Sequence, residues 1–237
     1  MANSRHLKRT SMPISWPVQR KLITFISRPV PGSYNRKYVV SLTVLLRDIL
    51  KIAKTSKEVK FIVHNKEVLV NGKEVSESKY ACGMFDIVEI KSSEEKFTIL
   101  FDEFGKVRII PVKDNLLYLK VSSKTIASGK KYQINFMNGY NIFVDEKTFK
   151  SVKVNDTIIY DYKSKKVSKT VPLKEGSFTY IFDGKYKGKF GEVKSFVHFN
   201  GVAKDTVQVQ IADELHTTAK DYCFAIGLKK EDLKRFE

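Results

Sequence analysis

The sequence has few cysteines and histidines. Cys82 and Cys223 are its two cysteines among 237 residues, and they lie too far apart for the disulfide framework of a small secreted protein. We expect both to be reduced core residues. The four histidines are scattered, and no pair has the spacing of zinc ligands with a cysteine beside it. The sequence therefore predicts no metal site.

Long apolar runs are also missing. No run of about 18 apolar residues occurs, as a membrane-spanning helix needs, and residues 1–13 hold no apolar segment of a secretory signal. With 42% hydrophobic and 12% aromatic residues, the chain can still bury cores. We expect a soluble intracellular protein of two or three small modules, with no membrane partner.

The motifs of common enzymes are absent as well. The sequence contains no GxxxxGK[ST], GxGxxG, GxSxG or HExxH. Asp86 and Asp156 each precede or enter an apolar strand, where an aspartate typically caps a turn. The sequence therefore predicts no catalytic residue, no cofactor and no small-molecule substrate.

Acidic residues are missing from the first fifth of the chain. Residues 1–47 carry nine basic side chains and no acidic one, so they supply +9 of the net charge of +17. Six of the eight arginines lie here, and the planar guanidinium grips phosphate and stacks on bases. A charge of one sign over so many residues favours contact with RNA over a merely solvated tail. Prolines interrupt any amphipathic helix, which disfavours a membrane surface as the partner.

Residues 1–41 are therefore predicted to form a basic N-terminal extension, called the arm below. Trp16-Pro17 and Arg28-Pro29 favour extended backbone. Because like charges repel, we expect the arm to be disordered until RNA neutralises it. Trp16 could either dock the arm on its own domain or stack on a base. The candidate RNA contacts of the arm are Arg5, Lys8, Arg9, Arg20, Lys21, Arg28, Arg36 and Lys37.

The next segment, residues 42–91, changes to helical periodicity. Apolar residues recur at helical spacing over residues 42–53, and Thr55 to Glu58 reads as a capping box that opens a second helix. Asn71-Gly72 lies between two short apolar runs, which predicts a hairpin with a type I′ turn, and residues 87–90 predict another strand.

These residues resemble the S4-type RNA-binding domain, which has a helix pair followed by a VxVNGxxV hairpin. The stretches "KEVLVNGKEV" and "GMFDIVEI" carry the resemblance. In that family the helix pair forms a basic face for structured RNA. By position this implies RNA contacts at Arg47, Lys51, Lys54, Lys57 and Lys60, with Lys73 in the hairpin.

Short alternating strands separated by turns follow from residue 96 onward. They are expected at 97–101, 107–110, 132–136, 141–144, 158–160 and 167–171. Such spacing indicates small barrels or sandwiches and not a nucleotide-binding fold of alternating strands and helices. We expect a central β module at residues 96–172.

The last segment, residues 173–237, has its own signature. "TYIFDGKYKGKFGEV" at 179–193 resembles the KOW motif, in which two strands of a small SH3-like barrel flank a glycine-rich basic loop. The resemblance implies RNA contacts at Lys185, Lys187 and Lys189. Gly184, Gly188 and Gly191 would be the structural glycines of the loop, because glycine permits tight backbone and close approach.

The order of the segments resembles the archaeal and eukaryotic small-subunit ribosomal protein S4e family along essentially the whole chain. "VKVNDTI" at 152–158 and "FDEFGK" at 101–106 match patterns of that family. The resemblance implies an α+β, mostly β chain that is a structural constituent of the small ribosomal subunit and not an enzyme. Its partners would be small-subunit rRNA and neighbouring small-subunit proteins, in the cytoplasmic ribosome, with nucleolar assembly in a eukaryote.

The sequence is compatible with two other functions. The first is an RNA-modifying enzyme that uses an S4-type domain as its RNA grip, although the GRLD-like aspartate motif of pseudouridine synthases is absent. The second is a KOW-containing transcription or translation factor, which would explain the last segment but not the one at residues 42–91.

Overall fold

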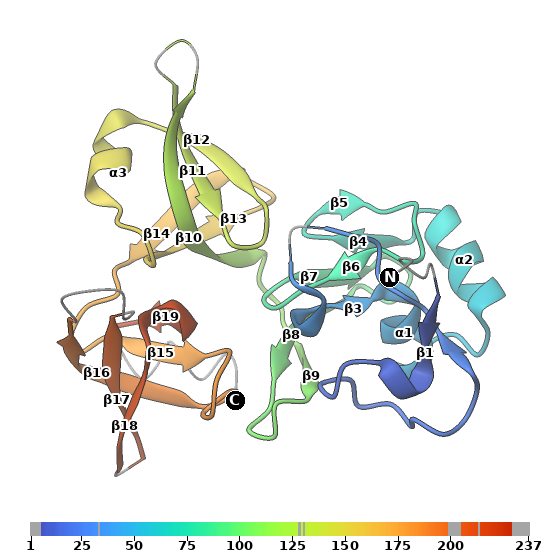
Figure 1. The fold of residues 1–237 in the computed structure, drawn as a ribbon. Coiled ribbons are helices and arrows are strands. Elements are labelled where there is room, and N and C mark those ends of the chain that lie inside the picture. The colour runs from blue at the N-terminus through green and yellow to red at the C-terminus, as the bar shows by residue number, and fades with distance from the viewer. Residues whose placement is uncertain are drawn as a thin grey trace. The chain divides into compact units, whose positions relative to one another are not determined.

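The computed structural model describes residues 6–32, 34–127, 129, 131–198, 205–212 and 214–228. The chain forms two compact units (Figure 1). The first comprises Met1–Leu100 and Lys106–Asn115, and the second comprises Phe101–Gly105 and Leu116–Glu237. Strands dominate and helices are few, as the sequence predicts. No helix among the described residues has the length and apolar character needed to cross a membrane.

The described part of the arm is folded onto the first unit. Strand β1 (Leu7–Lys8) pairs with β2 (Phe25–Ile26), and Leu7, Met12, Trp16 and Ile26 are buried. Two short 3₁₀ turns complete it, η1 (Arg9–Ser11) and η2 (Arg36–Tyr38). The expectation of a disordered arm is therefore wrong for these residues, because the apolar side chains between the basic ones supply an anchor.

The helical part of the first unit is shorter than the sequence pattern predicts. Helix α1 (Leu42–Val44) continues into a π-helical segment, η3 (Leu45–Ile49). Lys51 then takes a left-handed conformation with φ of 58°, which ends the helix before residue 53. Helix α2 (Ser56–His64) follows where it was predicted.

A five-stranded antiparallel sheet with the order β5-β4-β7-β8-β9 completes the first unit. Asn71 and Gly72 have φ of 53° and 74°, which confirms the hairpin with both central residues at positive φ. A separate pair, β3 with β6, joins the end of the arm to this unit. The strands are β3 (Val40–Ser41), β4 (Val68–Val70), β5 (Lys73–Glu74), β6 (Ala81–Cys82), β7 (Ile87–Ile90), β8 (Glu95–Phe101) and β9 (Val107–Pro111).

The sheet pairing differs from the module boundary that we expected near residues 91–96. Strand β8 pairs with β7 from Ile87↔Thr98 to Ile90↔Glu95, so residues 96–100 and 106–111 extend the first unit and do not open the central module. The polar stretch at 91–95 is a tight connection between two paired strands. Turn residues at a hairpin and at a linker are of the same types, which is why the sequence did not separate them.

The first sheet of the second unit has the order β12-β11-β10-β13-β14. Its long strand β10 pairs with β13 through one half and with β11 through the other, with a register shift between Val121 and Ser123. A short helix, α3 (Glu146–Ser151), lies beside it (Figure 1). The strands are β10 (Leu116–Ala127), β11 (Lys131–Phe136), β12 (Asn141–Val144), β13 (Thr157–Asp161) and β14 (Lys166–Val171).

The second sheet of this unit has the order β18-β17-β16-β15-β19, and a 3₁₀ turn, η4 (Lys220–Tyr222), precedes its last strand. Ile181, Val193, Val207, Val209 and Cys223 form its buried core. The strands are β15 (Phe178–Ile181), β16 (Phe190–Val197), β17 (Thr206–Ile211), β18 (Glu214–Ala219) and β19 (Cys223–Gly227).

Lys120 on β10 ties the two sheets of the second unit together. It is 4% exposed, and its Nζ donates to the carbonyls of Asp221 and Cys223 at 2.6 Å each. Burial lowers the pKa of this ammonium to about 8. Cys223 is itself buried, as is Cys82, and burial raises the pKa of both thiols, so both lie in the core as predicted.

Candidate nucleic-acid interface

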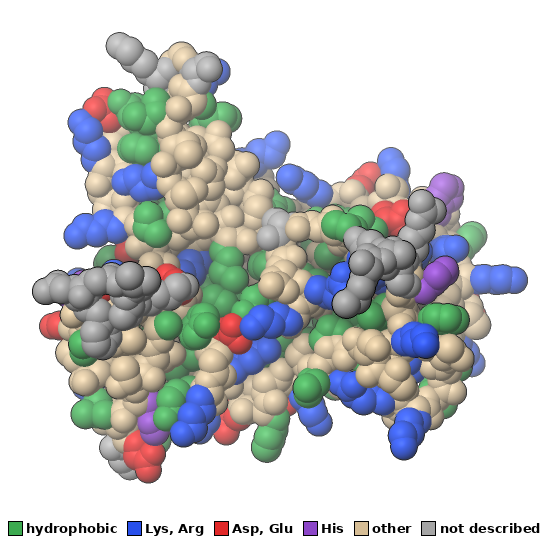
Figure 2. All heavy atoms as spheres, in the orientation of Figure 1, with side chains coloured by type: hydrophobic (Ala, Val, Ile, Leu, Met, Phe, Trp, Pro, Cys, Tyr) green, Lys and Arg blue, Asp and Glu red, His purple; other side chains and the backbone are tan. Residues whose placement is uncertain are grey.

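Lys and Arg side chains are spread over the visible face of each unit and outnumber the acidic ones (Figure 2). The sequence assigns RNA contacts to the arm, to residues 47–60 with Lys73, and to the loop at 183–189, which we call the basic loop. Arg5 lies outside the described residues. The structure places every other candidate, and the candidates differ in exposure.

Most basic side chains of the arm are exposed. Lys8, Arg20, Lys21, Arg36 and Lys37 have exposed side chains, and Arg28 is half-buried. The guanidinium of Arg20 also donates to the carbonyls of Thr10 and Met12, at 2.9 and 3.2 Å. These bonds fix the direction of the side chain while leaving it at the surface.

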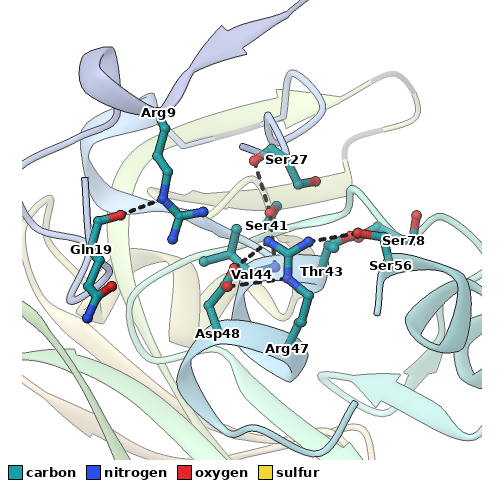
Figure 3. A network of polar contacts seen from close by, with 10 residues as sticks. All are labelled: Arg9, Gln19, Ser27, Ser41, Thr43, Val44, Arg47, Asp48, Ser56 and Ser78. Carbon is teal, nitrogen blue, oxygen red and sulfur yellow. Dashed lines mark hydrogen bonds and ion pairs between the residues drawn. The ribbon is translucent and has the colours of Figure 1, made fainter. Parts of the chain in front are cut away.

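Arg9 is the exception within the arm. It is 2% exposed, and its Nε donates to the carbonyl oxygen of Gln19 (Figure 3). Its backbone N–H donates to the carbonyl of Thr24 at 2.9 Å. Arg9 therefore stabilises the segment that contains β1 and β2 from its buried side. Its contact with RNA stays a prediction.

Trp16 and Tyr34 dock the arm on the first unit. Trp16 is 3% exposed, and its Nε1 donates to the carbonyl of Val39 at 2.9 Å. The ring of Tyr34 covers Gly83, where an added Cβ would lie 2.2 Å from the ring, and its hydroxyl donates to the carbonyl of Met84. Of the two roles open to Trp16, the structure selects the docking anchor.

The lysines at 51–60 lie on two different elements. The predicted capping box is confirmed, because Glu58 N donates to Thr55 Oγ1 at 3.2 Å and Thr55 Oγ1 donates to Glu58 Oε1 at 3.0 Å. Lys57 and Lys60 are exposed on the helix α2 that this box opens. Lys51 and Lys54 are exposed as well, but they lie on the connection before α2 and not on a helix face. Lys73 is exposed on β5, next to the hairpin turn.

Arg47 is engaged within the protein. It forms an ion pair with Asp48 at 2.7 Å, and its other terminal nitrogen donates to Ser56 Oγ at 2.8 Å (Figure 3). Both charged side chains are 16% exposed. Arg47 thereby joins η3 to the start of α2. The sequence could not predict this contact, because it depends on the two helices being adjacent in space.

Asp86 organises the turn before β7. Its carboxylate accepts from Asn71 Nδ2 at 2.8 Å and from the backbone N–H of Gly83 at 2.6 Å, while Asn71 Oδ1 accepts from the N–H of Ile87. Burial raises the pKa of Asp86 to about 6, although both hydrogen bonds act to lower it. Asp156 likewise accepts from the backbone of Lys153 and Leu173. The predicted role of both aspartates as turn caps is confirmed.

The basic loop of the second unit is built on close backbone contact. Gly188 has φ of 87°, and a Cβ there would lie 1.8 Å from the carbonyl oxygen of Asp102. The hydroxyl of Tyr180 accepts from the N–H of Phe101 and donates to its carbonyl, at 2.8 and 3.0 Å. The turn Phe101–Gly105 thus forms one wall against which the loop rests.

The lysines of the basic loop differ in their surroundings. Lys185 is exposed, Lys189 is half-buried, and Lys187 places its Nζ 3.4 Å from the centre of the Phe101 ring. The aromatic residues of the loop pack inward: Tyr186 stacks on His216 with ring centres 4.2 Å apart, and Phe190 contacts Tyr180 at 5.0 Å. Base stacking by these two rings would therefore require them to leave existing partners.

Comparison with known proteins identifies relatives of this chain. The profile of the ribosomal family S4e matches residues 83–167, and that of the RS4NT (NUC023) domain matches residues 1–34. The small ribosomal subunit protein eS4 of Methanocaldococcus jannaschii is 31% identical over 97% of each chain. The protein of the same name from Archaeoglobus fulgidus is 33% identical, over 96% of this chain and 95% of its own.

A solved structure agrees with these matches. The crystal structure of the 30S ribosomal protein S4e from Thermoplasma acidophilum superposes with a TM-score of 0.68 and 28% identity, over 81% of this chain and 97% of that one. On the strength of sequence identity over nearly its full length, this chain belongs to the ribosomal family S4e.

Proposed function

We propose that this protein is a structural constituent of the small ribosomal subunit that binds rRNA and supports subunit assembly and translation. The observation that carries the proposal is identity of about 30% over nearly the whole chain to proteins named as small-subunit constituents. The net charge of +17, of which +9 lies in residues 1–47, suits a protein that neutralises phosphates where RNA strands converge. Its partners would be rRNA and neighbouring ribosomal proteins in the cytoplasm, with nucleolar assembly in a eukaryotic cell.

Three surfaces are assigned to rRNA in this proposal. They are the exposed basic residues of the arm, the exposed lysines around α2, and the basic loop. The helix pair and hairpin of the first unit would act as an S4-type domain, and the sheet that carries the basic loop as a KOW barrel. The folded modules, together with the arm docked on the first unit, would recognise RNA shape.

The test is sucrose-gradient sedimentation of the tagged protein from a native extract, at low and at high salt. Stoichiometric cosedimentation with the small subunit that resists a salt wash supports the proposal, because a protein bound at many phosphates dissociates slowly. Absence from purified subunits, or release by a modest salt wash, would contradict it and indicate a transient factor.

A further inference from the structure

The first sheet of the second unit carries an open groove that none of the three surfaces above includes. The groove has a volume of about 620 Å³, and both edge strands of the sheet, β12 and β14, contribute to its lining. The residues that line it include Lys131, Tyr132, Phe143, Tyr160, Lys165 and Lys166.

The charges in this groove are unevenly compensated. Lys131, Lys165 and Lys166 make no ion pair and no side-chain hydrogen bond with any residue that the structure describes. In contrast, Glu146 in the lining is held by Lys150 at 2.5 Å, and this bond lowers the pKa of the carboxyl group. The lining thus holds three lysines against Asp145 and the already paired Glu146, and this excess of positive charge suits an anion.

Phe143 on β12 offers a surface for a flat ligand, because its side chain is 62% exposed. Phe143 pairs with Gln133, whereas Tyr132 pairs with Val144, so the side chains of Phe143 and Tyr132 lie on opposite faces of these two strands. Tyr132 contacts Phe149, with ring centres 4.9 Å apart. An exposed ring beside uncompensated lysines is the combination with which proteins bind single-stranded nucleic acid, because bases stack on the ring while lysines bind the phosphates.

We propose that this groove binds a single-stranded segment of RNA, with one base stacked on Phe143 and adjoining phosphates bound by Lys165 and Lys166. The inference rests on the proposed rRNA-binding function and adds to it a site and a class of ligand. A duplex does not fit this arrangement, because its bases are already stacked and cannot reach Phe143.

The experiment measures binding of fluorescein-labelled hexauridylate to the full-length protein by anisotropy, over a series of salt concentrations. Phe143→Ala should weaken binding by about tenfold or more, since the stacking of one base is removed. Lys165→Ala with Lys166→Ala should weaken binding and lower the salt slope by about 0.7 for each phosphate that is no longer bound. Ile126→Ala and Lys163→Ala are the matched controls, because both side chains are exposed on the same sheet region but do not line the groove.

A second measurement locates the bound RNA. Hexauridylate containing 4-thiouridine is cross-linked to the protein, and the modified peptide is identified by mass spectrometry. Cross-links within residues 141–144 or 157–166 support the proposal. Circular dichroism of each variant establishes that it is folded, so that weaker binding is attributable to the groove.

The possible failures are distinguishable. If hexauridylate binds, but Phe143→Ala behaves like Ile126→Ala and the cross-links lie in the arm, the groove proposal is overturned while rRNA binding stands. If hexaglutamate displaces the RNA from the wild type and binds the Phe143→Ala variant equally well, the groove is a site for acidic peptides and the proposal is again overturned. If no hexauridylate binds although the protein cosediments with the small subunit, only the groove proposal fails.

Discussion

Gly188 occupies a position where a side chain has no space. Its φ of 87° disfavours residues with a Cβ, and that Cβ would lie 1.8 Å from a backbone oxygen of Asp102, which belongs to the wall of the loop. Backbone cannot rotate away as a flexible side chain can. Substitution must therefore move either the loop or the turn.

We expect Gly188→Ala to destabilise the protein by about 2 kcal/mol or more beyond the effect of Gly176→Ala. Gly176 is the matched control, because its φ of 79° is similar and no atom lies within 4 Å of a Cβ added there. The control should lose only about 1 kcal/mol, the cost of the left-handed conformation. Urea unfolding of both variants checks this, and equal losses would show that the close approach to Asp102 is unimportant.

The buried carboxyl of Asp86 makes stability depend on pH. Its pKa of about 6 in the folded chain is above the value of about 3.9 in an unfolded one. The folded state therefore binds this proton more tightly, and the free energy of unfolding falls as the pH rises from about 4 to about 6. Below this window the group costs nothing, and above it the full cost of a buried charge is present.

Asp86→Asn should remove this part of the pH dependence. We expect the drop in unfolding free energy between pH 4 and pH 6.5 to be smaller in the variant, by on the order of 2 kcal/mol. Chemical unfolding across this pH range measures the effect, and parallel curves would contradict the assignment.

For single residues, the sequence predicted the role of a side chain better than the residues that it contacts. The turn-capping role of Asp86 could be predicted, because aspartate before an apolar strand has few other uses. The burial of Arg9 and the pairing of Arg47 with Ser56 could not, since both depend on which segments become neighbours in space. The same limit applied to Trp16, whose two roles differ only in what covers the ring.

The start of helix α2 is defined by a local motif, the capping box of Thr55 and Glu58. Thr55→Ala should destabilise the first unit by about 0.5–2 kcal/mol, because it removes the side-chain acceptor for the N–H of Glu58. Thr55→Ser retains that acceptor and should restore most of the stability. Thermal unfolding compares the three proteins, and an alanine variant as stable as the wild type would mean that the cap contributes nothing.

The lysines around α2 should contribute to RNA affinity through charge alone. Replacing Lys51, Lys54, Lys57 and Lys60 by alanine is expected to weaken binding to rRNA fragments and to lower the salt slope by about 0.7–0.9 for each phosphate that is no longer neutralised. All four are exposed, so stability should change little. Filter binding over a range of potassium chloride concentrations checks this. An unchanged salt slope would mean that these side chains do not contact phosphates.

Arg47 is expected to behave differently from these lysines. Arg47→Ala leaves Asp48 without its ion pair and Ser56 without its donor, so we expect a decrease in stability on the order of 1 kcal/mol. The salt slope of RNA binding should change less than for any of the lysines. A slope change with unaltered stability would instead make Arg47 a phosphate contact.

The strands that the sequence predicted were placed closely, but others were missed. The predicted strands in the β-rich part lie within two residues of the observed ones, because apolar alternation and turn residues are local signals, whereas β10, β17, β18 and β19 were not predicted. The helix expected to reach residue 53 ends near residue 49, because Lys51 takes a left-handed conformation. Lysine has no preference for that conformation, so the sequence did not predict it. Two of the lysines were therefore assigned to a helix face that does not exist.

For the whole molecule, a net charge of +17 opposes the compact state. Because self-repulsion is screened by ions, we expect the melting temperature of the free protein to rise by a few degrees when sodium chloride is raised from about 20 to 300 mM. Scanning calorimetry measures this. A falling melting temperature would mean that attractive pairs, such as Arg47 with Asp48, outweigh the repulsion.

The family of the molecule could be predicted from the order of its motifs, but its division into units could not. The arm, the hairpin, the central strands and the basic loop each carry a sequence signal, and together they led to the S4e family. The two units depend instead on β8 pairing with β7 and on the turn at 101–105 joining the later half of the chain. Pairing between strands is decided by tertiary contacts, which local patterns do not specify.

The turn Phe101–Gly105 has a consequence for synthesis on the ribosome. Its partners Tyr180 and Gly188 are made about eighty residues later, which at roughly 5–20 residues per second is a delay of several seconds. During that time the first unit can close while the partners of the turn are still untranslated. The second unit therefore cannot reach its final form until nearly the whole chain has been made, and a fragment that begins at residue 116 would lack a wall that its basic loop requires.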